Sequence, residues 1–294
     1  FVIFSGKSAA SNYNQLFQYF TPLLKIFINI YCLSSEVKYI DSTELNEIDY
    51  FRSHFTIDDL ISLSFDASGL SDSQKDEAVL KMFDSLHLIE DIGTTVEQLA
   101  IFVIKVKHSY KSEVPFHNYA NAVNSMQLMF VILMRSQKVD NNKNKPFNFS
   151  PIQKAALLIA ALLKDVGHEG FDSLFLKKSF SPFVYAHGSE STLEHFHLST
   201  AVQLVQEFLI SDSSSKYSPL WSIISSSILS TDIELIDHFL TSFDLVASKF
   251  DPKNESNLLD LAKLIVILTD FSRFFRPFEL SKKQAELLME EKKR

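Results

Sequence analysis

From about residue 56 to the end of the chain, apolar residues recur at intervals of three and four, which is the spacing of an amphipathic helix. Glycine and proline number only six and eight, whereas all-β folds use many of both in their turns. The sequence therefore predicts an all-α fold. Helices are expected at residues 56–65, 76–92, 94–110, 118–137, 151–165, 191–209, 221–243, 256–273 and 281–294.

The predicted helices form one domain. Thr56, Ser73 and Thr95 each stand at the beginning of a helical run, as residues that cap helix N-termini do. The sequence contains no internal repeat and no interdomain linker, and 294 residues with 46% hydrophobic content are enough to bury a core. We expect a partly irregular N-terminal segment at 1–55 and a compact helical domain at 56–294.

Charge and cysteine content narrow the classes of function. The net charge is −8 and there is no long run of Lys and Arg, so nucleic-acid binding is not expected. Cys32 is the one cysteine, which excludes an internal disulfide and favours a reducing, cytoplasmic location. The apolar run 155–163 is about half of the ~20 residues that span a membrane. Because the chain opens with Phe1, we expect a fragment or a processed chain.

Polar residues border several of the apolar helices. The sharpest pair is Asp165 and Asp270, because each places a carboxylate at the C-terminal end of an apolar helix, where the helix dipole disfavours negative charge. Each is either an ordinary helix end exposed to solvent or part of a buried site. Two carboxylates inside a core require a compensating cation, either a metal or a lysine. The other bordering residues are His117, His168, Glu194, His197 and Asp232.

Five segments, in order, resemble the catalytic domain of the class I cyclic-nucleotide phosphodiesterases. "SEVPFHNYANAVNSMQ" resembles the family segment in which Tyr-His-Asn is followed by a second His, and "ALLKDVGHEG" resembles Ala-Leu-x-His-Asp-x-x-His-x-Gly. "SESTLEHFHLSTAV" is similar to the Ser-x-Leu-Glu-x-x-His helix. "ILSTDIELIDHF" is similar to the Ala-Thr-Asp segment, and "LIVILTDFSRFFRP" to Ala-Asp-Leu-Ser-Asn-Pro. The resemblance covers about residues 56–280 and implies an all-α fold.

In that family a zinc is held by two His and two Asp, and a second ion, usually magnesium, shares one Asp. The ions acidify the attacking water and neutralise the phosphate, and a His protonates the departing 3′ oxygen. By resemblance His117 is the general acid, Asp165 is the shared ligand and Asp270 is the other Asp ligand. The resemblance assigns supporting positions around the metals to His168, Glu194 and His197, and matches Asp232 to the Asp of the Thr-Asp segment.

Two positions depart from the family. Asn121 and Lys164 stand where the family has its two His ligands. An amide oxygen is a weak ligand for zinc, and a charged lysine repels a dication, so we expect zinc and magnesium to bind weakly or not at all. Lys164 is adjacent to Asp165 and, in the family's geometry, near Asp270, so its ammonium would replace the metal as their counter-charge. The alternative is that Lys164 turns out to solvent.

A third departure concerns the nucleotide pocket. Only 24 residues follow Asp270, and the charged tail 281–294 offers no aromatic clamp or glutamine for a purine. Either the chain is truncated at its C-terminal end, or the purine pocket is missing. An apolar face left exposed would then bind a partner chain, as a homo- or hetero-oligomer.

Three interpretations stay open. The favoured one is a phosphodiesterase-family domain that has lost metal-dependent catalysis and acts as a regulatory or binding module in cyclic-nucleotide signalling, with weak binding of cyclic nucleotide. The second is a divergent enzyme that hydrolyses a 3′,5′-cyclic nucleotide, cAMP in preference to cGMP, to the 5′-monophosphate, with one metal held by Asp165, Asp270 and His168. The third is an unrelated helical scaffold.

Overall fold

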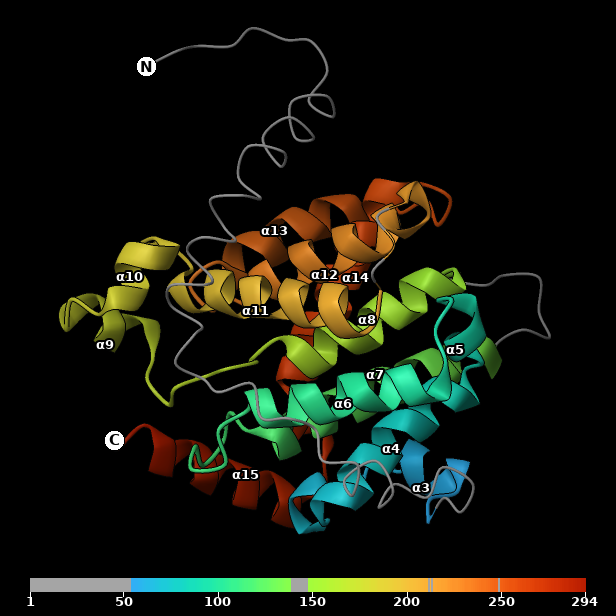
Figure 1. The fold of residues 1–294 in the computed structure, drawn as a ribbon. Coiled ribbons are helices and arrows are strands. Elements are labelled where there is room, and N and C mark those ends of the chain that lie inside the picture. Colours follow the sequence, from blue (N-terminus) through green and yellow to red (C-terminus); the bar gives the residue numbers. More distant parts are fainter. Residues whose placement is uncertain (1–53, 139–147, 211, 213, 248) are drawn as a thin grey trace, which may run out of the picture. The chain divides into compact units, whose positions relative to one another are not determined.

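The computed structural model describes residues 54–138, 148–210, 212, 214–247 and 249–294, all of which belong to the unit Ser42–Arg294 (Figure 1). Every regular element in these ranges is a helix, so the predicted all-α class is confirmed. The N-terminal segment expected at 1–55 lies almost wholly outside the described residues. The α-helices are α3 (Ile57–Ile61), α4 (Asp72–Ser85), α5 (Leu88–Asp91), α6 (Val96–Ser109), α7 (Tyr119–Lys138), α8 (Pro151–Leu163), α9 (Ser173–Lys178), α10 (Pro182–His187), α11 (Thr192–Phe208), α12 (Ser218–Leu229), α13 (Ile236–Ala247), α14 (Glu255–Asp270) and α15 (Phe278–Glu291).

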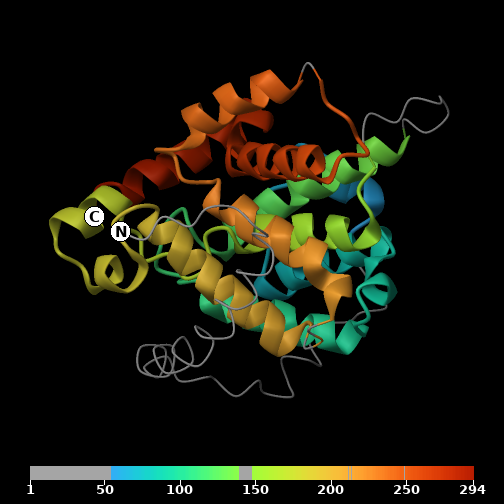
Figure 2. The same cartoon turned by 90° about the horizontal axis from the view of Figure 1, so that it is seen from above.

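Helix α8 is the centre of the core. Residues 155–163 are all fully buried, which is what a helix that is apolar on every side requires. It packs mainly against α12 and α7, while α14 packs against α12 and also contacts α7 and α8 (Figures 1 and 2). The C-terminal ends of α8 and α14 therefore lie inside the domain. None of the described helices is long and apolar enough to cross a membrane.

Side-chain caps fix where several helices begin. Thr56 and Thr95 cap α3 and α6 as predicted. The prediction that Ser73 caps the next helix is wrong. Helix α4 begins two residues earlier, because the Ser71 hydroxyl accepts from the backbone N–H of Gln74 at 3.2 Å and the Gln74 side chain accepts in return from the Ser71 N–H.

Two of the predicted helices are interrupted. The run 76–92 breaks at His87, which has left-handed backbone angles, before α5. The run 221–243 breaks between α12 and α13, where hydroxyl side chains bond to backbone carbonyls and the carboxylate of Asp232 accepts from the N–H of Glu234 at 2.8 Å. Such local bonds compete with helical ones, which the apolar periodicity does not show. Helices α9 and α10 were not predicted.

The turn after α8 depends on glycine. Gly167 and Gly170 have positive φ angles of 77° and 83°, which residues with a Cβ rarely adopt. A Cβ on Gly167 would lie 2.9 Å from Cε1 of Phe196, so the turn packs directly on α11. Since His168 lies between the two glycines, this tight turn determines where its ring is placed.

We predict that Gly167→Ala lowers the free energy of unfolding by roughly 2–4 kcal/mol, because the new methyl group adds both backbone strain and a clash with Phe196. Urea denaturation measures the change. Gly69→Ala is the matched control, since Gly69 has open space where a Cβ would lie and no positive φ. Equal stability of Gly167→Ala and the wild type would contradict this account of the turn.

Candidate functional site

Lys164 places its ammonium between two carboxylates. It is the C-cap of α8, and 1% of its side chain is exposed. Its Nζ donates to Oδ2 of Asp165 and lies 2.6 Å from Oδ1 of Asp270, the last residue of α14. The ion pair expected from the sequence is therefore present, and Lys164 does not turn to solvent.

Electrostatics keep both members of this pair charged. Burial by itself would lower the pKa of Lys164 and raise that of Asp165. The charges of Asp165 and Asp270 outweigh burial and hold the pKa of Lys164 above its ordinary value. The charge of Lys164, with smaller contributions from His117 and His197, likewise holds the pKa of Asp165 well below its usual range. One ammonium thus serves as the shared counter-charge of two carboxylates, and the group keeps a net charge of −1.

His117 pairs with a residue from the other end of the sequence. Its Nδ1 lies 2.5 Å from Oε1 of Glu291, the last residue of α15. The second carboxylate oxygen of Glu291 accepts from the backbone N–H groups of Phe116 and His117, both at 2.9 Å. Glu291 is buried, so these contacts fasten the end of α15 to the segment that leads into α7. With Nδ1 engaged, Nε2 is the nitrogen of His117 that is left to exchange a proton.

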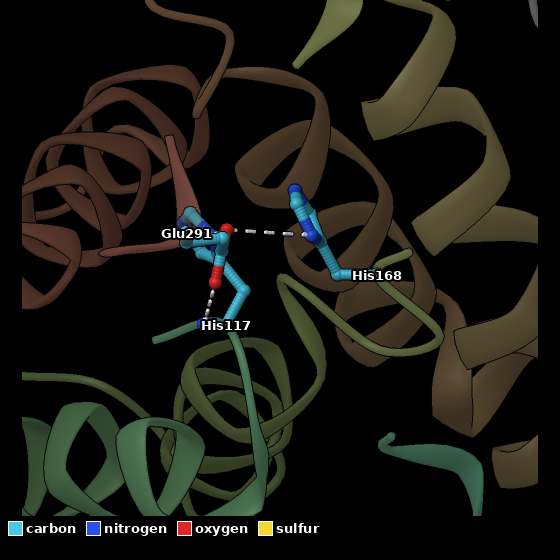
Figure 3. Close-up of side chains that lie close together, drawn as sticks. All are labelled: His117, His168 and Glu291. Atoms are coloured by element: carbon cyan, nitrogen blue, oxygen red, sulfur yellow. Dashed lines mark hydrogen bonds and ion pairs between the residues drawn. The ribbon is translucent and has the colours of Figure 1, made fainter. Parts of the chain in front are cut away.

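Three imidazole rings lie in a row. The ring centroids of His117 and His168 are 4.2 Å apart, and those of His168 and His197 are 5.6 Å apart. Nδ1 of His168 accepts from the N–H of Gly170 at 2.9 Å, so this ring carries its hydrogen on Nε2. Figure 3 shows the carboxylate of Glu291 close to both His117 and His168; its Oε1 is 3.9 Å from Nδ1 of His168.

The three histidines differ in charge. Burial lowers the pKa of His168 well below its ordinary value and that of His197 to about 4, and the positive charge of His117 adds to both shifts. Burial also disfavours the charged form of His117, but the hydrogen bond to Glu291 and the negative charges of Asp165 and Glu291 together outweigh it and raise the pKa of His117. In Glu291, the hydrogen bond and charge of His117 and the two backbone N–H groups together outweigh burial and lower its pKa to about 2. One imidazolium therefore stands beside two neutral rings.

Glu194 lies near enough to three other carboxylates of the site to feel their charge. Burial, with smaller contributions from the negative charges of Asp232, Asp165 and Asp270, raises its pKa to about 7. Its Oε2 is buried without a hydrogen-bond partner among the described residues. Asp232 is more firmly held, because its Oδ2 accepts from the hydroxyl of Ser191 at 2.6 Å.

The structure brings most of the predicted site together. Asn121 is buried on the first turn of α7, one helical turn after His117, and its backbone N–H donates to Oδ1 of Asn118 at 3.2 Å. Glu291 was missed, because it lies in a charged helix far along the chain and in none of the quoted motifs. The predicted residues linked here by contacts or by electrostatic interaction are His117, Lys164, Asp165, His168, Glu194, His197, Asp232 and Asp270.

Residues 116–294, more than half of the chain, match the protein family described as 3′5′-cyclic nucleotide phosphodiesterase. The chain belongs to this family. The match begins at the residue before His117 and contains every predicted site residue. The family that the sequence motifs indicated is therefore confirmed. The roles of the individual site residues stay predictions.

Similar proteins agree with this assignment. The dual 3′,5′-cyclic-AMP and -GMP phosphodiesterase 11A of Takifugu rubripes is 27% identical over 235 residues, which cover 78% of this chain and 25% of that protein. The cGMP-specific 3′,5′-cyclic phosphodiesterase of Drosophila melanogaster is 28% identical over 238 residues, or 79% of this chain and 20% of that protein. The chain thus spans a quarter or less of these relatives.

The fold has a counterpart among solved structures. The phosphodiesterase domain of the RhoPDE fusion protein from the choanoflagellate Salpingoeca rosetta superposes with a TM-score of 0.72 at 24% sequence identity. The superposition covers 79% of this chain and 73% of that one. At this identity the likeness establishes the fold.

We predict that Lys164→Met lowers the free energy of unfolding by roughly 2–4 kcal/mol at neutral pH, because it leaves two largely buried carboxylates, 14% and 25% exposed, without a counter-charge. Folding lowers the pKa of Asp165, so the stability from this pair is complete above its unfolded value of about 3.9 and is lost as the pH falls through the folded one. The deficit of Lys164→Met should therefore shrink below about pH 4. Urea denaturation between pH 3 and pH 8 tests both statements.

Lys154→Met on the same helix is the matched control, since Lys154 forms no ion pair with the residues that the structure describes. A deficit no larger than that of the control, or one that grows as the pH falls, would contradict the buried ion pair.

We predict that Glu291→Gln lowers the pKa of His117, because the carboxylate hydrogen bond that favours the imidazolium is lost. In the wild type this pair stabilises the fold fully below the unfolded histidine pKa of about 6.5, and its contribution is lost as the pH rises through the folded value. A histidine titration followed by NMR measures the shift. Glu290→Gln is the control, because Glu290 is the exposed neighbour of Glu291. An unchanged pKa of His117 in Glu291→Gln would contradict the pairing.

Proposed function

We propose that this phosphodiesterase-family domain has lost metal-dependent hydrolysis and acts as a binding or regulatory module in cyclic-nucleotide signalling. One observation carries the proposal: the ammonium of Lys164 lies buried between Asp165 and Asp270. These are the two carboxylates that, by resemblance, would hold the zinc.

The donor set does not fit the family's metals. The site offers two carboxylates that are already bonded to an ammonium, and Asn121 takes the place of one imidazole. A divalent ion bound there would face the positive charge of Lys164, whose proton is retained because its pKa is raised. Zinc binding would therefore require displacing a buried salt bridge and would still lack two nitrogen ligands.

The histidines of the site also form contacts that hold the fold together, independently of any catalytic reaction. The His117–Glu291 pair joins the segment before α7 to the end of α15. His197 donates from Nδ1 to the carbonyl of Val166 at 2.8 Å and so holds the turn after α8. These contacts support a folded module whose site is stabilised by its own side chains.

A second function is favoured by a different observation. His117, His168 and Glu291 offer ligand atoms within 4.8 Å of one another, and two imidazoles with one carboxylate suit a transition metal. Ligation would require His117 to give up its proton, so in this alternative His117 serves as a ligand and not as the general acid. On this reading the chain is a divergent hydrolase of 3′,5′-cyclic nucleotides that uses its ion at a displaced position.

We predict that the purified chain retains no zinc after incubation with zinc and magnesium followed by desalting, and that it does not hydrolyse cAMP or cGMP. The physical reason is the ammonium of Lys164, which already occupies the space between Asp165 and Asp270 and is bonded to both. Elemental analysis and a nucleotide assay are the measurements. About one firmly held zinc per chain with metal-dependent turnover would overturn the proposal in favour of the divergent hydrolase.

We further predict that Asn121→His combined with Lys164→His creates a site that holds about one zinc per chain, since it restores two imidazoles beside two carboxylates. The matched control adds Asp270→Asn, which should weaken zinc binding again by on the order of 10-fold or more. A folded double variant that binds no more zinc than the wild type would show that these four positions do not form the metal site.

A further inference from the structure

Arg273 is held on aromatic rings beside the site. It lies in the short 3-10 helix η4 (Ser272–Phe275), three residues after Asp270. Its guanidinium carbon is 4.6 Å from the ring centroid of Phe274, 5.7 Å from that of Phe116 and 5.8 Å from that of Phe271. Three rings therefore orient one planar cation.

The nitrogen atoms of this guanidinium have no hydrogen-bond acceptor and no ion-pair partner among the residues that the structure describes. Arg276, one turn further on, is used differently: it is buried, and its two terminal nitrogens donate to the carbonyls of Phe65 and Asn124, both at 2.9 Å. Aromatic faces hold Arg273 in place but leave its in-plane donors unused, which is the arrangement that binds a carboxylate or a phosphate in bidentate fashion.

The position of Arg273 connects it to the polar site. Phe116, which it covers, is followed by His117, and the two rings are in edge contact with centroids 4.9 Å apart. On the other side, the chain runs directly back to Asp270, whose carboxylate accepts from the ammonium of Lys164 at 2.6 Å. The charged groups nearest to Arg273 along the chain and through Phe116 are therefore engaged in ion pairs: His117 with Glu291, and Asp270 with Lys164.

We propose that Arg273 binds the phosphate of a nucleotide at this site and so takes over the anion recognition for which the family uses metal ions. Exposed rings adjoin it, since Phe274 is 68% and Phe275 is 44% exposed, and they offer a surface on which a base can stack. The ligand is a nucleoside monophosphate, cyclic or open. The inference rests on the proposed function, because it supplies the ligand of a module that no longer hydrolyses it.

Arg273 also stands where the resembling family segment has Asn, in "TDFSRF" against Ala-Asp-Leu-Ser-Asn-Pro. An uncharged amide is sufficient where metal ions hold the phosphate. A site without those ions needs another positive charge, and Arg273 brings one to the same segment.

The experiment is calorimetric titration of the whole chain, in EDTA, with cAMP, 5′-AMP, adenosine and inorganic phosphate. We expect 5′-AMP or cAMP to bind at least about 10-fold more tightly than adenosine, because adenosine lacks the phosphate. Arg273→Gln should remove that difference by weakening the two nucleotides at least about 10-fold while changing adenosine affinity by less than about 3-fold. Arg273→Lys, which keeps the charge but not the planar fork, should fall between them.

Arg135→Gln is the matched control, because Arg135 is an exposed arginine near the far end of α7 from His117. Wild-type affinity in Arg273→Gln, an equal loss for adenosine, or no binding of either nucleotide to the wild type would each overturn the proposal. If Arg273→Gln does not fold, the comparison of adenosine with the nucleotides in the wild type and in Arg273→Lys decides. Retained zinc with turnover would instead refute the proposed function, so the two failures are distinguishable.

Discussion

The buried charge of Lys164 is the interaction on which the centre of this domain depends. Helices α8 and α14 are apolar, and their C-terminal ends place Asp165 and Asp270 at the edge of the core, where neither partial burial nor the helix dipoles favour a carboxylate. A cation is required, and here the chain supplies it from the residue next to Asp165. Because that cation is covalently attached, these ends of α8 and α14 are held together whether or not an ion is available.

A second pair, His117 with Glu291, completes the site from its other side. It joins residues 174 positions apart, and it sets the end of α15 against the start of α7. The 3-10 helix η4 follows Asp270 directly and precedes α15, whose far end carries Glu291. The hydroxyl of Ser281 on α15 donates to the carbonyls of Arg273 and Arg276 and so fixes the end of η4 that leads into α15.

The sequence was informative where local pattern and motif order carry the structure. The all-apolar run of α8 predicted a buried helix, and the order of the motifs predicted that Lys164 would meet Asp270. Glu291 could not be found in this way, because a glutamate in an exposed-looking charged helix is ordinarily a solvated side chain, and only the tertiary fold reveals that it is buried. The break after α12 was likewise hidden, since it depends on hydroxyl and carboxylate bonds within an apolar periodicity.

The presence of a histidine at the general-acid position does not by itself argue for catalysis. Glu291 is buried and accepts two backbone N–H groups, so its carboxylate is fixed in place whether or not a reaction occurs. Removing the imidazolium would leave that carboxylate with two backbone donors but no counter-charge, which is costly in a protein interior. The pairing with Glu291 is therefore a reason for a histidine at this position that does not involve catalysis. The same argument applies to Lys164, which supplies the counter-charge of Asp165 and Asp270. In both pairs the carboxylate requires a cation beside it, whether or not the pair takes part in a reaction.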